Sequence, residues 1–423
     1  MKIKQKPMAY KDVIAIPQEK HIRPVKPNMF FRTLLRTLSV PELKSVGFEC
    51  RRHGMEKLGK DEPALFLMNH SCFIDLKIAA AELYPRPFNI VCTSDGFVGK
   101  DKLMRALGCI PTKKFIQDSA LVRDMLYTVK ELRSSILMYP EASYSFDGTA
   151  TPLPESLGKC IKLLKVPVVM IRTSGAFGRD PLYNMLQLRK VKVSADMSYL
   201  LSKEDIASMS AEEINAILRE QFRFDGFREQ REKEVRIDEP FRADGLNRVL
   251  YKCPHCKTEG EMSGKGIHIE CRHCGKKWEL TELGALKATD GETEYDHVPD
   301  WYAWERDEVR RELEEGKYKL DIPVDIGMLV DSQSLYMVGE GRLVHDKNGF
   351  VLTGCDGELS YTHTPAQSYS LYSDYYWYEI GDMICIGDSR ALYYCFPKEG
   401  GDVVAKTRLA AEELYKLNKA KKS

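Results

Sequence analysis

Short apolar runs alternate with helix-like segments along residues 61–195, and this alternation constrains the fold more than any other feature of the chain. Four runs have the length and composition of buried strands: ALFLM (64–68), FNIV (88–91), ILMY (136–139) and PVVMI (167–171). Between them lie three segments with the apolar spacing of helices: 75–83, 119–133 and 155–165. Buried strands joined by helices are typical of an α/β domain with a mixed sheet that helices largely cover. We therefore predict such a domain over 61–235.

The C-terminal half changes character twice. Ser210 and Glu213 form a capping-box pattern, which predicts a helix that continues into the charged run REQREKEVR. Four cysteines then gather in a compact module, predicted over 245–285, and a connector rich in Trp and acidic residues follows at 300–318. Beyond it, strand-like runs are separated by the turn signals DKNG, GCDG and EGGD, which predict a β-rich domain over 320–423, closed by the helix VVAKTRLAAEELYKL.

Composition excludes a mostly disordered chain, because 43% of the 423 residues are hydrophobic. The 63 Lys and Arg balance the 62 Asp and Glu, so the overall charge does not indicate a polyanionic partner. No run reaches the about 18 apolar residues of a membrane-spanning helix, and the start of the chain lacks the apolar stretch of a secretory signal. We therefore expect a cytoplasmic protein.

The sequence LMNHSCFIDL places His70 directly after a predicted strand and Asp75 at the start of the next helix. A carboxylate at this spacing can accept a hydrogen bond from one imidazole nitrogen, which leaves the other nitrogen free to take a proton from a hydroxyl. An isolated pair with this spacing also arises by chance or as a helix cap. The surrounding motifs are needed to decide.

Four motifs in order resemble the glycerolipid (lysophosphatidic acid) acyltransferase family. NHSCFID (69–75) resembles the N-H-x4-D signature of the family, and YPEASYS (139–145) resembles its F-P-E-G-T-R-S motif. GCIPTKKF (108–115) resembles the family segment that has a glycine, an apolar run and a basic residue. VPVVMI (166–171) resembles its V-P-[VI]-[VI]-P segment. The resemblance covers about residues 29–200. It implies that His70 is the general base, that Asp75 orients it, and that an acceptor hydroxyl attacks the thioester of an acyl-CoA or acyl-carrier protein.

The same resemblance implies that Glu141, Ser143 and the basic pair Lys113 and Lys114 bind the acceptor, and Arg172, just after the apolar segment 166–171, can offer a further point charge to an acceptor phosphate. Tyr144 stands where the family has an Arg that holds a phosphate, and Tyr cannot supply the bidentate fork of a guanidinium. An ordinary solvated pair remains an alternative for Lys113 and Lys114. Cys72 is interpreted as a small buried residue and not as a nucleophile.

The cysteine module has the spacing C-x2-C-x14-C-x2-C, formed by Cys253, Cys256, Cys271 and Cys274. Four thiolates in two such pairs supply a tetrahedral Zn²⁺ site, and four protein ligands leave no open position for catalysis. We predict a structural zinc ribbon, with GIHIE (266–270) and KWEL (277–280) as its strands. His255, His268 and His273 are interpreted as surface or packing residues.

The basic N-terminal segment 1–60 carries 14 Lys and Arg against 5 Asp and Glu and contains the amphipathic stretch MFFRTLLRTLS. Phe30, Phe31, Leu34, Leu35 and Leu38 fall on one helical face. Such a helix can lie in a membrane surface or pack on the α/β domain. We predict the first arrangement, with the protein peripheral on the inner face of the cell membrane.

Together these features predict an enzyme that transfers a fatty acyl group to a lysophospholipid or glycerol-phosphate-like hydroxyl at the membrane surface. The alternative is a non-enzymatic, acyltransferase-like binding protein whose zinc ribbon recruits nucleic acid or a protein partner. The mixed charges of the module and the lack of a flanking basic run disfavour nucleic acid. The sequence leaves the oligomeric state open.

Overall fold

The computed structural model describes residues 2–116, 118–398 and 402–421. Seven strands form a mixed sheet: β2 (Glu49–His53), β3 (Leu65–Met68), β4 (Phe88–Thr93), β5 (Cys109–Thr112), β6 (Ser135–Met138), β7 (Val168–Ser174) and β8 (Ser194–Leu201). Their order is β2-β8-β7-β3-β6-β4-β5, and β7–β8 is the antiparallel pair among otherwise parallel neighbours. Each of the four predicted strands is present within this sheet.

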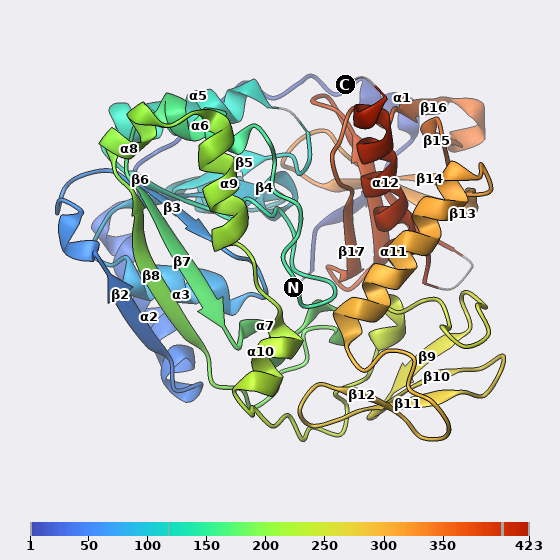
Figure 1. Cartoon of the computed structure of the whole chain (residues 1–423). Helices are drawn as coiled ribbons and strands as arrows, with labels where there is room; N and C mark the ends of the chain where they lie inside the picture. Colours follow the sequence, from blue (N-terminus) through green and yellow to red (C-terminus); the bar gives the residue numbers. More distant parts are fainter. Residues whose placement is uncertain (1, 117, 399–401, 422–423) are drawn as a thin grey trace.

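Helices cover both faces of this sheet (Figure 1). One group is α2 (Met29–Ser45) and α3 (Ile74–Glu82), and the other is α5 (Ser119–Lys130), α6 (Leu157–Leu164) and α9 (Ala211–Gln221). Alternate residues of β3 enter two different hydrophobic clusters. Leu65 and Leu67 pack with the second group, and Phe66 and Met68 pack with the first. The central strand is therefore buried on both faces, as its continuous apolar run predicts.

Two sequence expectations differ from the structure in this region. Strand β2 belongs to the sheet although it precedes residue 61, because it pairs with β8 along its whole length. The helix capped by Ser210 ends at Gln221, and the first five residues of the charged run lie in a separate helix, α10 (Gly226–Glu232). Asp225 caps this new helix, since its side chain accepts a hydrogen bond from the Arg228 backbone at 2.9 Å.

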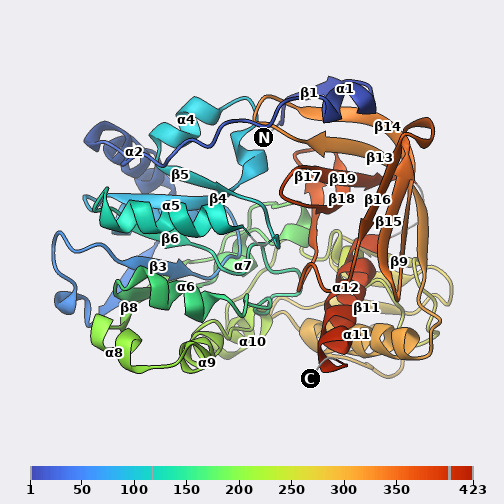
Figure 2. The ribbon, with the colours of Figure 1, turned by 90° about the horizontal axis from the view of Figure 1, so that it is seen from above.

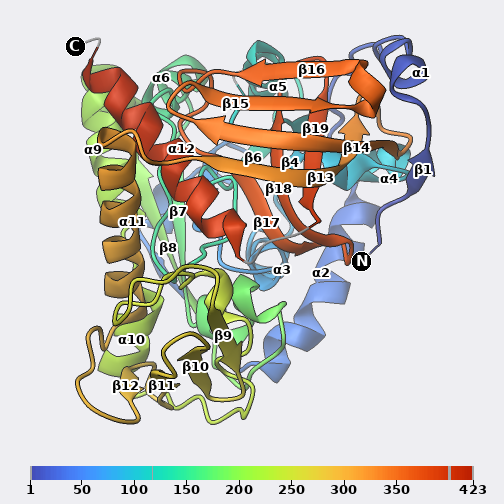
Figure 3. The ribbon, with the colours of Figure 1, turned by 90° about the vertical axis from the view of Figure 1, so that its right-hand side faces the viewer.

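The cysteine module folds as a four-stranded antiparallel sheet of β9 (Met262–Lys265), β10 (His268–Cys271), β11 (Lys277–Leu280) and β12 (Leu286–Ala288). The connector that follows is a helix, α11 (Val298–Glu314), which packs side by side with the last helix, α12 (Val403–Ala420) (Figure 3). Trp301, Glu305 and Glu308 of α11 are buried, so one side of this helix belongs to the interior.

A second, eight-stranded sheet occupies the C-terminal part. It contains β1 (Gln5–Pro7), β13 (Leu320–Leu329), β14 (Leu335–Asp346), β15 (Gly349–Gly354), β16 (Leu359–His363), β17 (Tyr372–Trp377), β18 (Gly381–Gly387) and β19 (Leu392–Pro397). The order is β16-β15-β14-β13-β19-β18-β17, and β1 pairs with β14. The start of the chain therefore joins the C-terminal sheet.

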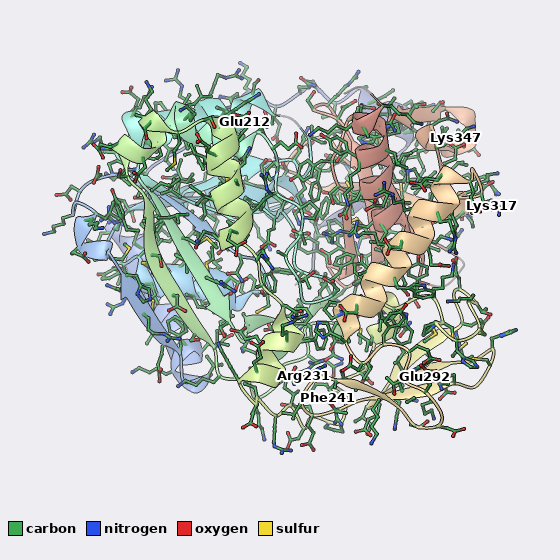
Figure 4. The ribbon with its side chains drawn as sticks, in the orientation of Figure 1. Glu212, Arg231, Phe241, Glu292, Lys317 and Lys347 are labelled. Atoms are coloured by element: carbon green, nitrogen blue, oxygen red, sulfur yellow. The ribbon has the colours of Figure 1, made fainter. Side chains whose placement is uncertain are left out.

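Strands β17–β19 lie beside the first sheet (Figure 2). Side chains fill the space between α9, which begins near Glu212, and α11, which ends near Lys317 (Figure 4). The remaining helices are short: α1 (Tyr10–Ile14), α4 (Asp101–Ala106), α7 (Ala176–Arg179) and α8 (Lys203–Ser208). In the described part of the chain, no helix is long and apolar enough to cross a membrane.

Candidate active site and metal centre

The loop between β3 and α3 is anchored to the neighbouring strand β7. The Asn69 carboxamide oxygen accepts hydrogen bonds from the Thr173 backbone nitrogen at 2.8 Å and from its hydroxyl at 3.1 Å. Both residues are buried. This anchor fixes the start of the loop, so that His70 lies at the carboxyl end of the central strand of the sheet.

His70 and Asp75 meet as the sequence predicts. The distance from His70 Nδ1 to Asp75 Oδ2 is 3.2 Å, and the same oxygen accepts backbone hydrogen bonds from Ser71 at 2.7 Å and Cys72 at 3.1 Å. Asp75 is fully buried in the first turn of α3, where the helix dipole favours a negative charge. The carboxylate is thereby held in one position beside the imidazole.

Two tyrosines enclose the His70 ring. Tyr139 stacks on it with the ring centroids 4.1 Å apart, and Tyr144 lies at 4.4 Å with a tilt of 54°. Burial lowers the pKa of His70, and the Asp75 carboxylate offsets this effect only in part. The imidazole is therefore neutral near pH 7, which is the protonation state that a general base requires.

Glu141 also holds the His70 loop. Its carboxylate accepts hydrogen bonds from the backbone nitrogens of His70 and Thr151, each at 2.9 Å. The side chain is buried, and this burial raises the pKa of Glu141 to about 7. Both carboxylate oxygens of Glu141 are thus hydrogen-bonded to backbone nitrogens. This arrangement suits a residue that holds His70 in position.

The other predicted acceptor residues are dispersed. Ser143 is buried and its hydroxyl accepts a hydrogen bond from Arg408 of α12 at 3.2 Å. The Lys113 ammonium donates to the carbonyls of Asp388 and Ser389, next to the C-terminal sheet. Arg172 is exposed on β7.

Of this group, Lys114 acts electrostatically on His70. Its ammonium lies 4.1 Å from the centroid of the Tyr372 ring on β17, and its positive charge contributes to the lowered pKa of His70. Cys72 is buried, as predicted, and its thiol donates to the Ala176 carbonyl at 3.3 Å. Burial raises the pKa of Cys72, so the thiol stays protonated.

The segment 370–380 of the C-terminal sheet makes contacts that none of the sequence motifs predicts. The Tyr372 hydroxyl donates to the Asp95 carboxylate at 2.5 Å, and Trp377 donates to the Tyr372 hydroxyl at 3.0 Å. Burial raises the pKa of Asp374 to about 6, while the charge of Lys114 lowers it. These contacts join the C-terminal sheet to the loops around His70, and the density of aromatic residues is the only sequence signal for them.

The four cysteines of the ribbon converge. All four Sγ atoms lie within 4.8 Å of one another, with Cys253–Cys274 at 3.8 Å and Cys256–Cys271 at 3.7 Å. A tetrahedron with Zn–S distances of about 2.3 Å has S–S edges of about 3.8 Å, so the thiols fit a zinc ion. Gly275 has φ +76°, the left-handed conformation expected after the second cysteine pair.

Two of the histidines near the cysteines have other partners. His255 Nδ1 lies 3.1 Å from a Glu294 oxygen, and His273 Nδ1 lies 3.3 Å from the Thr258 hydroxyl. These contacts agree with their interpretation as surface or packing residues.

Residues 49–174 match the model of the acyltransferase family. The match agrees with the resemblance that the motifs indicate, and the matched residues include His70, Asp75 and Glu141. Among the solved structures that match is the crystal structure of the 1-acyl-sn-glycerophosphate (LPA) acyltransferase PlsC from Thermotoga maritima, at 14% sequence identity and a TM-score of 0.34. The match covers 46% of this chain and 80% of that chain. None of the curated proteins compared matches the sequence.

Proposed function

We propose that the protein transfers a fatty acyl group from an acyl-CoA or acyl-carrier-protein thioester to a hydroxyl of a lysophospholipid or glycerol-phosphate-like acceptor. One observation carries the proposal. Within the domain that matches the acyltransferase family, a neutral His70 lies at a strand end, with Nδ1 3.2 Å from a buried carboxylate. Proton transfer from a hydroxyl to such a base raises the rate by about 10²- to 10⁴-fold.

In this mechanism His70 Nε2 takes the proton of the acceptor hydroxyl while its oxygen attacks the thioester carbonyl. The new C–O bond forms, the C–S bond breaks, and the sulfur leaves as a thiolate that takes the proton from the imidazolium. Asp75 stabilises the imidazolium, and the bonds of Asp75 to Ser71 and Cys72 keep the pair aligned. Glu141 acts as a positioning residue through its bond to the His70 backbone.

Helix α2 supports the proposed position at a membrane surface. Phe30, Leu34 and Leu38 recur at every fourth residue and expose 67%, 36% and 66% of their surface. Phe73 is exposed as well and lies three residues after His70. An apolar ridge of this kind suits the boundary between headgroups and acyl chains.

The two arginines of α2 contact the protein. The Arg32 guanidinium donates to the Pro85 carbonyl, and that of Arg36 lies 4.7 Å from the centroid of the Tyr84 ring. The two arginines therefore attach the helix to the domain. The exposed apolar ridge is the part of α2 that can contact lipid.

The zinc ribbon has a structural role in this proposal. A zinc ion held by Cys253, Cys256, Cys271 and Cys274 would fold the ribbon, and its complete set of protein ligands leaves the chemistry to His70.

The test is acyl transfer from labelled acyl-CoA and labelled acyl-carrier protein across a panel of lysolipids and glycerol phosphate, with His70→Ala as the matched inactive variant. We expect transfer to at least one acceptor and its loss in the variant, with folding and donor binding retained. A parental protein that transfers to none of these acceptors would favour the non-enzymatic alternative. A His70→Ala protein as active as the parent would instead refute the role of His70 as the base.

A further inference from the structure

The segment that follows β6 contacts the loop that carries His70 at several points. Tyr139 and Tyr144 of this segment lie against the His70 ring. The Glu141 carboxylate accepts a hydrogen bond from the His70 backbone nitrogen, and the Ser145 backbone nitrogen donates to the His70 carbonyl at 3.2 Å. The position and the surroundings of the imidazole therefore depend on the conformation of this segment.

The middle of the segment has an unfavourable backbone conformation and an outside support. Ala142 has φ +56°, the left-handed conformation that residues with a side chain rarely adopt. Such a conformation persists where the surrounding structure holds it in place. Ser143, the next residue, is buried, and its hydroxyl accepts a hydrogen bond from Arg408 Nη2 at 3.2 Å. The supporting residue lies on α12, 265 positions further along the chain.

Arg408 is itself held in one orientation. Its guanidinium carbon lies 4.2 Å from the centroid of the Phe146 ring, and its Nε lies 3.2 Å from a Glu412 oxygen. Glu412 is also buried, and it accepts hydrogen bonds from Ser370 at 2.7 Å and from Arg306 of α11 at 2.8 Å. Burial opposes the charge of Glu412, but the charges of Arg306 and Arg408 lower its pKa to about 2. The guanidinium therefore reaches the segment from an ionic network that fixes its position.

The helix that carries Arg408 is attached to the cysteine module as well. Asp402, the residue before α12, accepts a hydrogen bond from Asn247 at 2.6 Å. Lys406 of α12 donates to Glu259 at 2.7 Å. Both partners belong to the module predicted over 245–285. The last helix of the chain thus connects this module to the segment around the catalytic loop.

We infer that Arg408 is a positioning residue for the proposed acyl transfer, on which this inference rests. Through Ser143 it holds the segment whose Tyr144 covers the imidazole. A lysine cannot replace this guanidinium, because it has no planar fork that bonds Glu412 and Ser143 at the same time. Loss of the bond should let Tyr144 move away from His70 and let water reach the ring.

Two substitutions break this bond from opposite sides. Arg408→Lys keeps the charge of the network and removes the donor, and Ser143→Ala removes the acceptor. Each should lower kcat by about 10- to 100-fold, because a misplacement of about 1 Å can lower a rate by up to about 100-fold. The double variant should be no slower than the slower single variant, since both changes break the same bond. Arg242→Lys is the matched control and should leave kcat unchanged, because this buried arginine donates to the Leu280 carbonyl of the ribbon at 2.6 Å.

The pH profile separates positioning from a merely structural role. Burial lowers the pKa of His70, so exposure of the ring to water should raise it. The acid limb of the kcat/KM profile should therefore move to higher pH in Arg408→Lys and in Ser143→Ala. A variant that only loses stability keeps the parental limb. Apart from the change at Ser143 or Arg408, both variants keep the titratable groups beside His70, which are Asp75, Lys114, Tyr139, Glu141 and Tyr144.

NMR titration of the imidazole signals measures the same pKa without turnover, and the His70 signal is assigned by its absence in His70→Ala. A raised pKa of His70 in both variants of a protein that transfers no acyl group would support the positioning role and reject the proposed function. Folded variants with the parental kcat and the parental pKa of His70 would overturn the inference. So would a lowered kcat with an unchanged pKa, or effects that add in the double variant.

Discussion

Replacing Asp75 by Asn isolates the charge of the proposed dyad, because a single carboxylate oxygen makes all of its hydrogen bonds. Oδ2 accepts from His70, Ser71 and Cys72, whereas Oδ1 is buried without a partner in the described part of the chain. An Asn carbonyl oxygen in the place of Oδ2 keeps these three bonds. The variant therefore preserves the orientation of the imidazole and removes the negative charge beside it.

The expected loss follows from the difference between charged and neutral hydrogen bonds. Bonds to charged groups contribute about 1.5–3 kcal/mol and neutral ones about 0.5–1.5 kcal/mol, so the imidazolium loses about 1–2 kcal/mol of stabilisation. At 1.36 kcal/mol for each factor of ten, kcat should fall by about 5- to 30-fold. His70→Ala should lower kcat further, by about 10²- to 10⁴-fold, because it removes the base itself.

The pH profile gives an independent readout. The Asp75 carboxylate raises the pKa of His70, so its neutralisation lowers that pKa further. Since the base acts in its neutral form, the rate falls when the pH drops below the pKa of His70. The acid limb of the kcat/KM profile should therefore move to lower pH in Asp75→Asn.

The assay compares pH–rate profiles of the parental protein, Asp75→Asn and His70→Ala, with thermal unfolding as a check on folding. Asp124→Asn is the matched control, because Asp124 forms a second His–Asp pair, with His21 at 3.0 Å, elsewhere in the domain. It should leave both kcat and the acid limb unchanged. A folded Asp75→Asn protein with the parental rate and the parental limb would refute the dyad, as would a loss greater than that of His70→Ala.

Three further predictions concern the metal, the membrane and Glu141, which holds the His70 loop. Elemental analysis should find one zinc ion per chain, and Cys256→Ser should release it and unfold the ribbon locally; zinc-free protein with an intact ribbon would contradict this. Phe30→Ser combined with Leu38→Ser should weaken sedimentation with anionic vesicles, whereas Leu163→Ser on α6 should have no effect. Sedimentation of the parental protein should also fall as salt rises. Equal sedimentation of the parent, the double variant and Leu163→Ser would exclude α2 as the docking surface. Because burial raises the pKa of Glu141 from 4.5 to about 7, its contribution to folding is present below about pH 4.5 and is lost as the pH rises through about 7. Relative to Glu141→Gln, the parental free energy of unfolding in denaturant titrations should therefore fall by about 3 kcal/mol over this interval, and parallel pH curves would argue against a buried, titrating Glu141.

Much of the local structure was predictable from the sequence because it depends on short-range patterns. The apolar run 64–68 became β3, and the helical spacing of 119–133 became α5. The final helix begins at Val403, as its periodicity predicts. The same holds for the cysteine pairs, since two tight turns bring the thiols of each pair together.

Other features depended on contacts that no local pattern contains. The sequence indicates a connector at 300–318, yet this segment forms most of α11, and Trp301, Glu305 and Glu308 on it are buried. Glu141 was expected to bind substrate, but its carboxylate bonds to two backbone nitrogens that the motif alone does not place near it. The pairing of β1 with β14 joins residues more than three hundred positions apart.

By itself the sequence determined the chemistry that lies within single segments. The spacing of His70 and Asp75 across one strand–helix loop sets their hydrogen bond, and the cysteine spacing sets a four-thiolate cluster, because a short connection leaves few relative positions for two side chains. Only the tertiary structure decided what surrounds His70. Tyr139, Lys114 and the C-terminal strand β17 come from distant parts of the chain, and their positions follow from how the two sheets pack, which depends on the sum of many weak apolar contacts and on no single motif.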